Sequence, residues 1–353
     1  VSFTYDARGL LKNYDDGNTI GTYLYDAKKQ LTDVTINFGT FSKSHYYSYY
    51  PNGLKQSYIN PEGIEYNYSY DGNGQLKELI VPDEGSITVN DYQWTAPTEI
   101  TYPGGAKNRM DYDGTLRLKQ RRYQDQANTV QHQASYSYDN EDNIKTQHSE
   151  QSERSYDYDS LYRLTDVTVN LDNFSISLLG NEKYSYDKVG NRLSTVNSKQ
   201  DWLYNANNQL THADNINYEY DLNGNQISKT DNTTNQTTHY IYNSEQRLIR
   251  LEDNDRQILA VYFYNPFGQR VSKKVKGITT YFLYSQEGLV AEYSQTGQLK
   301  TEYHYQPNSA WMTNPLFMRT NYSEVLYYHN DHLGTPQALY NKQGQQKWLA
   351  NYT

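Results

Sequence analysis

The sequence predicts an all-β protein built from consecutive β-hairpins, and three observations lead to this expectation. A short unit, Tyr-x-Tyr followed by Asp or Asn, recurs along almost the whole chain. Within each unit the aromatic residues alternate with a period of two, which places them on one face of a strand. No long stretch has apolar residues at helical spacing, and β-favouring Tyr, Thr, Val and Ile fill the segments between turns.

The last Tyr of each unit marks the repeat. Most steps between these residues are about 20 to 22 residues long, a few reach 25 or 28, and two shrink to 16 or 18. The marker residues are Tyr5, Tyr25, Tyr50, Tyr70, Tyr92, Tyr112, Tyr138, Tyr158, Tyr186, Tyr204, Tyr220, Tyr242, Tyr264, Tyr284 and Tyr305. A constant unit with variable spacing predicts loops of different lengths on a regular frame.

Each unit contains two strands and a turn. Tyr240 and Tyr242 show the first strand, because alternate side chains point to the same face. Turn formers follow, as in residues 221–225, where Gly supplies positive φ and Asp bonds its own backbone. The second strand begins at an apolar residue such as Ile227. Strands of about seven residues would span roughly 23 Å, so each unit is a β-hairpin.

The best-preserved units assign structural roles to the second Tyr, the Asp after it and the Gly of the turn. These positions are Tyr70, Asp71, Gly74, Tyr138, Asp139, Tyr158, Asp159, Tyr186, Asp187, Gly190, Tyr220, Asp221 and Gly224. We expect Tyr to build the sheet and Asp and Gly to form its turns, with no chemical role for any of them.

Tyrosine dominates the composition, with 40 Tyr against 8 Phe and 4 Trp in a chain that is 36% hydrophobic. Each Tyr can bury roughly 150–250 Å² while its hydroxyl keeps a partner, so Tyr must supply much of the buried area. We therefore expect a thin sheet in which each hairpin contacts mainly its neighbours.

Charge and composition exclude several classes of function. The formal charge of −9 argues against nucleic-acid binding, which needs a basic patch. The absence of Cys removes thiolate catalysis, thiolate metal sites and disulfides. No run of 18 apolar residues and no secretory leader is present, which indicates no membrane span. Because the chain starts at Val1, we expect it to be a piece of a longer protein.

The repeats resemble the YD repeats of the Rhs family, which the B and C components of insecticidal Tc toxins and the teneurin ectodomain share. The best matches are YSYDKVGNRL at 184–193 and YEYDLNGNQI at 218–227. The segment 327–336, followed by Gly344 and Trp348, is similar to the core signature near the end of Rhs repeat regions. The signature residues are Tyr328, Asp331, His332, Leu333, Gly334, Thr335 and Pro336.

The resemblance implies a continuous antiparallel strip that spirals into a hollow shell, or part of one, around a C-terminal toxin. It divides the chain into a hairpin array over 1–306, an irregular insertion over 307–326 and a core-like segment over 327–353. The implied partners are the toxin cargo, a secretion or delivery apparatus, and neighbouring chains at exposed strand edges. The implied location is outside a bacterial producing cell, secreted or at the cell surface.

The resemblance implies no enzyme. Relatives usually carry a self-cleaving Asp-Pro-x-Gly region after the core segment, and the sequence to Thr353 contains none. The alternative function is a carbohydrate or cell-wall binding module, because choline-binding repeats are also hairpins of about 20 residues with paired aromatics. Those repeats depend on Trp, whereas the four Trp residues here do not recur with the period.

Three further patterns in the sequence resemble chemical sites. His329, Asp331 and His332 form a tight cluster but lack a fourth ligand for a metal. Asp221–Asn225 approaches a calcium loop but lacks the downstream Glu. Acid pairs around Asp253, including Glu252, fit a solvated loop better than a glycosidase pair. The sequence thus predicts no catalytic residue, no metal site and no cofactor.

Overall fold

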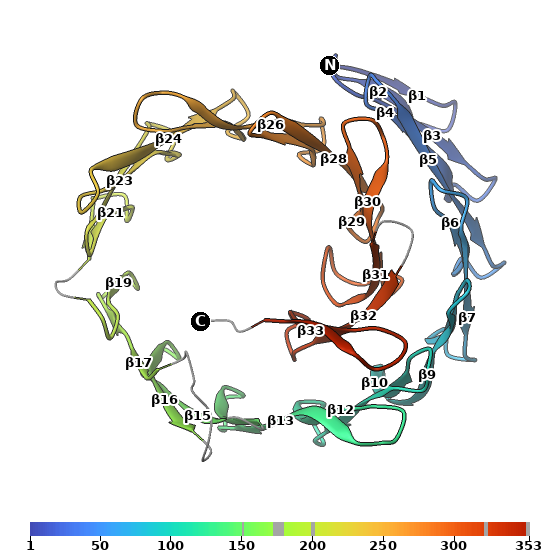
Figure 1. Ribbon diagram of the computed structural model, residues 1–353, viewed down its shortest axis with the longest axis horizontal. Helices are drawn as coiled ribbons and strands as arrows, with labels where there is room; N and C mark the ends of the chain where they lie inside the picture. Colours follow the sequence, from blue (N-terminus) through green and yellow to red (C-terminus); the bar gives the residue numbers. More distant parts are fainter. Residues whose placement is uncertain (150–151, 172–179, 199–201, 321–323, 351–353) are drawn as a thin grey trace. The chain divides into compact units, whose positions relative to one another are not determined.

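The computed structural model describes residues 1–149, 152–171, 180–198, 202–320 and 324–350. These residues form 34 strands and no helix, so none of their segments is a helix able to cross a membrane. Consecutive strands pair antiparallel as hairpins, which confirms the predicted all-β hairpin array (Figure 1).

The chain divides into two compact units. Unit 1 comprises Val1–Gln131, Tyr264–Ser272 and Ile278–Tyr352. Unit 2 comprises His132–Phe263 and Lys273–Gly277. This division differs from the one inferred from the resemblance, because contacts between distant hairpins define unit 1.

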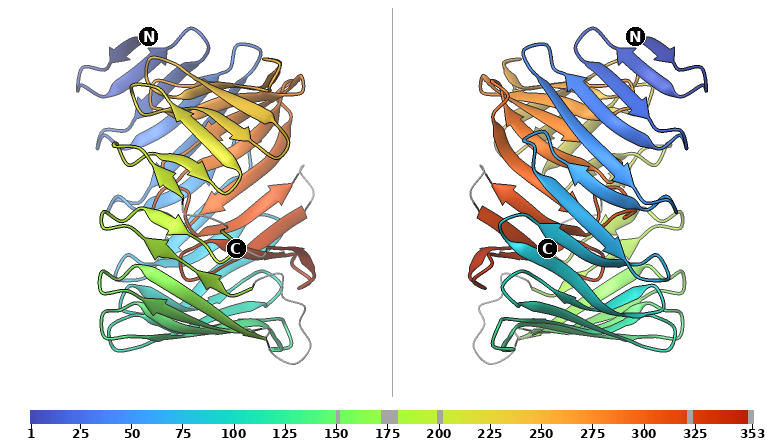
Figure 2. Two further views of the ribbon diagram at one scale, coloured as in Figure 1. Left: turned by 90° about the vertical axis from the view of Figure 1, so that its left-hand side faces the viewer. Right: turned by 90° about the vertical axis from the view of Figure 1, so that its right-hand side faces the viewer.

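The first layer of unit 1 is a meander in which each strand pairs with the next. Its strands are β1 (Ser2–Tyr5), β2 (Leu11–Asp15), β3 (Ile20–Tyr25), β4 (Leu31–Asn37), β5 (Ser42–Tyr49), β6 (Lys55–Ile59), β7 (Glu65–Tyr70), β8 (Leu76–Val81), β9 (Gly85–Gln93), β10 (Ala96–Thr101), β11 (Lys107–Tyr112) and β12 (Leu118–Gln124). Figure 2 shows these strands lying side by side in chain order.

The second layer of unit 1 comes from the other end of the chain. Its strands are β27 (Arg270–Val275), which begins in this unit, β28 (Ile278–Tyr284), β29 (Leu289–Ser294), β30 (Leu299–Tyr305), β31 (Pro315–Thr320), β32 (Glu324–Asn330), β33 (Pro336–Tyr340) and β34 (Gln346–Leu349). From β28 to β34 each strand again pairs antiparallel with the next.

The core of unit 1 lies between these two layers. Tyr66 and Leu79 of the first layer are 0% exposed, as are Tyr293 and Phe317 of the second, and all four belong to one cluster. The Tyr66 and Phe317 ring centroids are 5.8 Å apart although the residues lie far apart in sequence. The expectation that hairpins contact mainly their neighbours is therefore wrong for unit 1. The alternation of residues in the sequence shows which side chains share a face of the sheet, but it does not show what packs on that face.

Unit 2 contains shorter and less buried strands. They are β13 (Val130–Tyr138), β14 (Ile144–Ser149), β15 (Ser152–Tyr158), β16 (Leu164–Leu171), β17 (Glu182–Lys183), β18 (Ser185–Tyr186), β19 (Arg192–Ser194), β20 (Leu203–Tyr204), β21 (Leu210–Ala213), β22 (Ile216–Tyr220), β23 (Gln226–Asp231), β24 (Gln236–Tyr242), β25 (Leu248–Glu252) and β26 (Ile258–Tyr264). Among the described residues, its fully buried apolar side chains are few, and they are Tyr136, Val167, Ala213 and Ala260.

The sheet of unit 2 is not one uninterrupted ladder. β18 and β19 form a two-stranded sheet of their own. Single backbone bonds link this hairpin to its neighbours, from the Tyr184 N–H to the Thr165 oxygen at 2.7 Å and from the Trp202 N–H to the Leu193 oxygen at 2.6 Å. Hydrogen bonds from the Tyr186 and Tyr204 hydroxyls also join this hairpin to its neighbours, so the described residues of the strip are connected here without an extended strand ladder.

The stretch 307–326, suggested as an irregular insertion, instead contains β31 and the start of β32. Pro315 opens β31 opposite Tyr305, a position where Pro is tolerated because it begins the strand. The part before Pro315 is a loop, and the Met312 N–H in this loop donates to the Glu287 oxygen at 2.8 Å. The Pro- and Met-containing stretch that interrupts the period is therefore a long connection between β30 and β31, and the hairpins continue after it.

Candidate functional site

The hairpin turns show what the repeated Asp does. Asp221 Oδ1 accepts hydrogen bonds from the backbone N–H groups of Asn223 and Asn225, both at 2.9 Å. The Asp221 N–H donates to the Asn225 oxygen at 2.9 Å, and the Gly224 N–H returns to the Asp221 oxygen at 3.1 Å. The same Asx turn, with bonds from the second and fourth residues after Asp, occurs in 71–75, 139–143, 159–163, 187–191 and 331–335.

These bonds occupy the carboxylate that a calcium ion would need. Asp221 Oδ2 accepts from the Asn225 side-chain amide at 2.9 Å. That bond, with the backbone N–H donors, holds the pKa of Asp221 below its ordinary value despite the opposing effect of burial. Both carboxylate oxygens thus face N–H donors, which is the geometry of turn capping rather than of ion coordination.

The fourth residue of each turn has a left-handed backbone. Gly224 and Gly190 occupy it with φ of 88° and 97°. Asp142 and Tyr162 occupy it in two other units with φ of 68° and 60°. The position therefore requires positive φ, and the sequence meets this need with Gly in some units and with strained residues in others.

The last Tyr of a unit ties its hairpin to the preceding one. The Tyr186 hydroxyl donates to the oxygen of Leu164, the first residue of β16, at 2.7 Å. The Tyr220 hydroxyl reaches the Leu210 oxygen in the same way at 2.9 Å. We call this contact a tyrosine tie; other examples are Tyr92 to Leu76, Tyr158 to Ile144, Tyr204 to Arg192 and Tyr284 to Arg270. Tyr49, the residue before the marker Tyr50, makes the same contact with Leu31.

Other contacts occur at two further repeat positions. Tyr70 packs its ring edge-on against Tyr50 at 6.2 Å, and Tyr50 instead donates to the Tyr68 oxygen at 2.9 Å. Tyr138 pairs with Ile144 across its hairpin, next to a register shift. A register shift of this kind recurs at the last Tyr of most units.

The core-like signature lies in the second layer of unit 1, on β32, the start of β33 and the turn between them. Tyr328 is 8% exposed and contacts Leu326, Leu339 and Met318. Gly334 has φ of 80°, and a Cβ there would lie 2.7 Å from the Asn314 side chain, so only glycine fits.

The turn of the signature follows the Asx pattern. Asp331 Oδ1 accepts from the Leu333 and Thr335 N–H groups, and Pro336 opens β33 opposite Asn330. Leu333 itself is 72% exposed, so its backbone rather than its side chain takes part in the turn.

The histidines of the signature do not converge with Asp331 as metal ligands. His329 lies among aromatic rings of both layers, with its centroid 3.5 Å from that of Tyr123 and 5.0 Å from that of Tyr340. Burial lowers the pKa of His332, against the opposing charge of Asp331. No group of three or more metal-binding side chains occurs in the part of the chain that the structure describes.

The acids suggested as a solvated loop also have structural roles. Glu252 ends β25, is only 7% exposed and forms ion pairs with Arg250 at 2.8 Å and Arg256 at 3.4 Å. Asp253 caps the next turn through the N–H groups of Asp255 and Gln257. The loop assignment is wrong for Glu252, because its neighbouring arginines compensate its burial.

A buried polar cluster joins the two layers of unit 1 and has no counterpart in the sequence prediction. Glu302 is 2% exposed. Its carboxylate accepts from the Asn60 amide at 2.9 Å and the Tyr66 hydroxyl at 3.2 Å, and lies 2.5 Å from His304 Nε2. His304 stacks on Phe317 with centroids 4.2 Å apart and 8° between the planes. The cluster thus links β30 and β31 to the β6–β7 hairpin.

Electrostatics favour the ionised form of Glu302. Burial alone would raise the pKa of this carboxyl. The attraction and hydrogen bond of His304, with the Asn60 bond and the nearby Arg319 charge, outweigh that effect and lower the pKa. The sequence held one indication of this cluster, the spacing Glu302-x-His304, which places an acid and a base on the same strand face. Such polar side chains need hydrogen-bonding partners if another layer covers that face.

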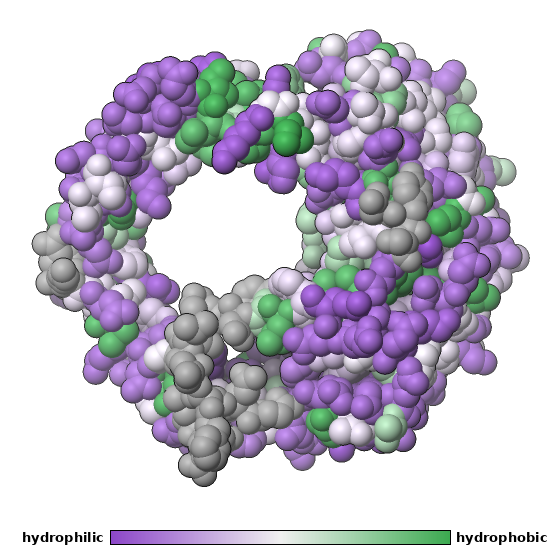
Figure 3. All heavy atoms as spheres, in the orientation of Figure 1, coloured by the Kyte–Doolittle hydropathy of each residue, from purple (hydrophilic) through white to green (hydrophobic). Residues whose placement is uncertain are grey.

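Further polar contacts cross between the layers along their length. They are Lys55 to Glu287, Tyr293 to Glu62 at 3.3 Å, Tyr327 to Glu84 at 3.3 Å, Tyr102 to the Tyr328 oxygen at 3.4 Å and Arg121 to the Asp331 oxygen at 2.8 Å. Hydrophilic residues cover much of the side of unit 1 that Figure 3 shows.

Most of the chain matches the model of a known family. The family model for the teneurin YD-shell matches residues 99–352. The chain belongs to the teneurin YD-shell family. The resemblance to YD repeats drawn from the two best units is thereby confirmed.

Solved structures share this YD-shell fold. A Photorhabdus luminescens Tc holotoxin pore is 13% identical, with a TM-score of 0.70 over 98% of this chain and 20% of that one. The TcdB2–TccC3 crystal structure is 12% identical, with a TM-score of 0.60 over 98% of this chain and 21% of that one.

Curated relatives of the YD-shell chain are much longer than it. A tRNA3(Ser)-specific nuclease WapA of Bacillus spizizenii is 26% identical over 312 residues, which cover 85% of this chain and 12% of the relative. Double-stranded DNA deaminase toxin A of Burkholderia cenocepacia is 26% identical over 244 residues, which cover 62% of this chain and 16% of the relative. The chain therefore spans less than a fifth of the curated relatives it matches.

Proposed function

We propose that this chain is a section of the wall of a toxin shell, which houses a C-terminal effector of its parent protein. The observation that carries the proposal is the combination of YD-shell membership with relatives that bear toxin names. The partners are then the effector and a secretion or delivery apparatus, and the site of action is outside the producing bacterium.

The chain itself acts as a wall and not as an enzyme. Its repeated Asp residues cap turns, its repeated Tyr residues tie hairpins, and the signature residue Tyr328 packs within the second layer of unit 1. The deaminase and nuclease activities in the relatives' names belong, on this proposal, to parts of those proteins outside the aligned segments.

The terminal strands are the natural places for further chain or other molecules to attach. The residues of β1 and of β34 are exposed along both strands. Exposed strands present unpaired backbone groups that recruit another strand. This supports the expectation that the strip continues, or pairs with neighbouring chains, at these two edges.

Limited proteolysis of the protein expressed from its complete reading frame tests the proposal. We expect a segment after Thr353 to resist proteinase K while the shell is folded and to be digested once urea unfolds it. The same segment expressed alone is the control and should be digested at once. A reading frame that stops at Thr353, or a downstream segment digested equally fast in both forms, would overturn the cargo role.

The alternative, a carbohydrate or cell-wall binding module, depends on exposed aromatic platforms that recur with the repeat. Trp94 is 83% exposed and Trp311 47% exposed, but they occupy different kinds of position in their hairpins. No observation favours this alternative over the shell, and saturable glycan binding by the isolated chain would be its support.

A further inference from the structure

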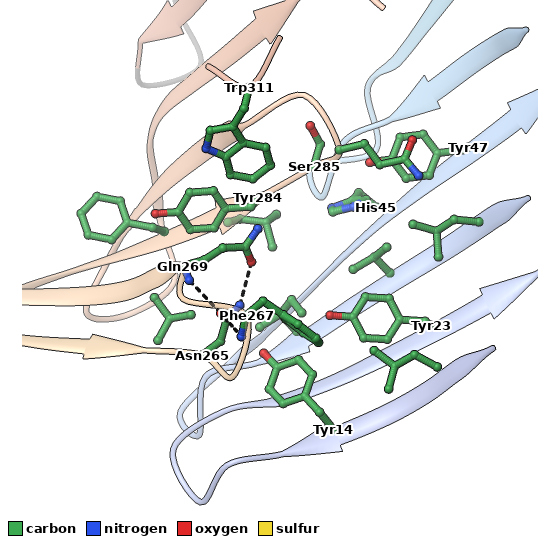
Figure 4. A pocket seen from close by; sticks show the side chains of 18 of the residues that line it. Tyr14, Tyr23, His45, Tyr47, Asn265, Phe267, Gln269, Tyr284, Ser285 and Trp311 are labelled. Atoms are coloured by element: carbon green, nitrogen blue, oxygen red, sulfur yellow. Dashed lines mark hydrogen bonds between the residues drawn. The ribbon is translucent and has the colours of Figure 1, made fainter. Parts of the chain in front are cut away.

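A cavity of about 330 Å³ lies between the two layers of unit 1 (Figure 4). Strands β2 to β5 form one wall, and β28 with the turn after β26 forms the other. The two walls come from opposite ends of the chain, so the cavity exists only when the layers pack together. None of the residues of the Glu302 cluster lines it, although Tyr284 and Leu31 of its lining also take part in tyrosine ties.

The lining of this cavity carries no charged side chain. Among the described residues that line it there is no Asp, Glu, Lys or Arg, and aliphatic and aromatic side chains dominate. A charged ligand would lose its hydration there without gaining a partner of opposite charge. The cavity therefore selects for neutral molecules.

Aromatic rings stand on both sides of the cavity. Tyr14 meets Phe267 edge to face, with centroids 5.3 Å apart and 89° between planes. Tyr284 stacks on Trp311, with centroids 5.9 Å apart and 13° between planes. Phe267 and Trp311 are about half exposed, at 48% and 47%, so rings also stand where the cavity opens. A flat ligand can insert between such rings in stacked or edge-on contact.

His45 supplies an unused polar group inside this apolar space. It is 0% exposed, and neither ring nitrogen has a hydrogen-bond partner among the residues that the structure describes. Burial, with a smaller effect of the Lys55 charge, lowers the pKa of His45 to about 3. The ring is thus neutral near pH 7 and offers one donor and one acceptor.

Asn265 and Ser285 of the lining are already engaged, whereas the buried hydroxyl of Tyr47, like His45, has no hydrogen-bond partner among the described residues. Asn265 accepts from the Phe267 and Gln269 N–H groups at 3.1 and 3.0 Å, and donates to the Gln269 side chain at 2.7 Å. The Ser285 hydroxyl donates to the Glu287 carboxylate and accepts from the Glu287 N–H. A buried polar group without a partner costs free energy that a ligand can recover. His45 has two unpartnered nitrogens and is 0% exposed, so we assign the ligand's polar atom to it.

We propose that this cavity binds a small neutral aromatic molecule with a single hydroxyl or N–H group, of the phenol or indole class. The ring lies among Tyr14, Phe267, Tyr284 and Trp311, and the polar group hydrogen-bonds to His45. The volume is at the lower end of the range for ligand pockets, which suits one or two fused rings. This binding is independent of the proposed shell function.

Ligand-observed saturation-transfer NMR on the full chain tests the proposal with four probes: phenol, indole, toluene and benzoate. We expect saturable signals for phenol and indole, binding about tenfold weaker for toluene, and weaker binding still for benzoate. Toluene keeps the ring but lacks the polar group, and benzoate adds a charge. The absence of saturable phenol and indole binding, or benzoate binding as strong as phenol, would refute the site.

Two variants identify the residues involved. His45→Leu should weaken phenol binding by about tenfold and leave toluene binding unchanged, because only the polar contact is lost. Trp311→Ala changes a half-exposed residue and so spares the fold, and it should weaken all ring ligands about fivefold. Trp348→Ala is the matched control, since Trp348 is 42% exposed and does not line the cavity. Equal losses in Trp311→Ala and Trp348→Ala would contradict the proposal, even if His45→Leu failed to fold.

Discussion

The Tyr186 hydroxyl lies 2.7 Å from the carbonyl oxygen of Leu164 and binds one hairpin to the start of the hairpin before it. Tyr186→Phe removes this tie but keeps the ring. We expect the free energy of local unfolding to fall by about 1 kcal/mol, so that amide exchange near the β16–β18 junction becomes roughly fivefold faster. Hydrogen-exchange mass spectrometry measures this change. Tyr162→Phe is the control, because Tyr162 is 60% exposed and should show no difference.

Asp221 predicts a clear contrast between two substitutions. Asp221→Ala should speed exchange at the Asn223 and Asn225 amides, because it removes the oxygen that accepts from both. Asp221→Asn should preserve their protection, since Asn205 caps the equivalent turn through its own side-chain oxygen. Equal exchange in the two variants would show that the side-chain oxygen does not stabilise the turn.

Tyr162 offers a stabilising change. It holds positive φ of 60° with its side chain exposed, so Tyr162→Gly should remove backbone strain and stabilise the β15–β16 hairpin by about 1 kcal/mol. Amide exchange in this hairpin should slow accordingly. The reverse change, Gly190→Ala, has free space around the new Cβ but φ of 97°, so it should destabilise its turn. A Tyr162→Gly variant that exchanges faster than wild type would contradict the role of strain.

Glu302 predicts acid sensitivity of the contact between layers. Its pKa is lowered in the fold, so its stabilising contribution is present above the ordinary value of about 4.5 and is lost as the pH falls through the lower folded value. Glu302→Gln should therefore give a flatter dependence of stability on pH below about 5. Urea unfolding followed by Tyr and Trp fluorescence between pH 3 and 7 measures it.

Glu302→Ala tests the same cluster at neutral pH. It leaves Asn60, Tyr66 and His304 without their shared acceptor, and should cost about 3–5 kcal/mol. Glu252→Ala is a comparison in unit 2, where the acid is also buried but the side chains of its partners Arg250 and Arg256 are open to solvent, and it should cost less. The same small loss in both variants would mean that the cluster does not hold the layers together.

Local structure was predictable from the sequence because its causes are local. Tyr-x-Tyr-Asp gives the strand period, and the turn at Asp221 uses only residues within four positions of it. The tie from Tyr186 to Leu164 was not predicted, since the repeat shows that Tyr is buried but not where its hydroxyl points.

The layering escaped prediction for a different reason. Glu302 and His304 read as an ordinary alternation within one strand, and nothing near them in sequence indicates that Asn60 and Tyr66 cover them. His45 is similar, because a lone His between tyrosines gives no sign of a cavity wall formed by Tyr284 and Trp311. Contacts between distant segments depend on how many hairpins separate them, which local patterns do not encode.

The tyrosine ties have a consequence for how such chains diverge. Each tie ends on a backbone carbonyl, as at Leu164, and a carbonyl is present whatever side chain the residue carries. The accepting residue can therefore be replaced freely while the bond survives; Arg192 and Leu210 both serve. A fold stabilised by such bonds can keep its architecture while most of its strand residues are substituted. The Tc holotoxin pore, at 13% identity and a TM-score of 0.70, illustrates this.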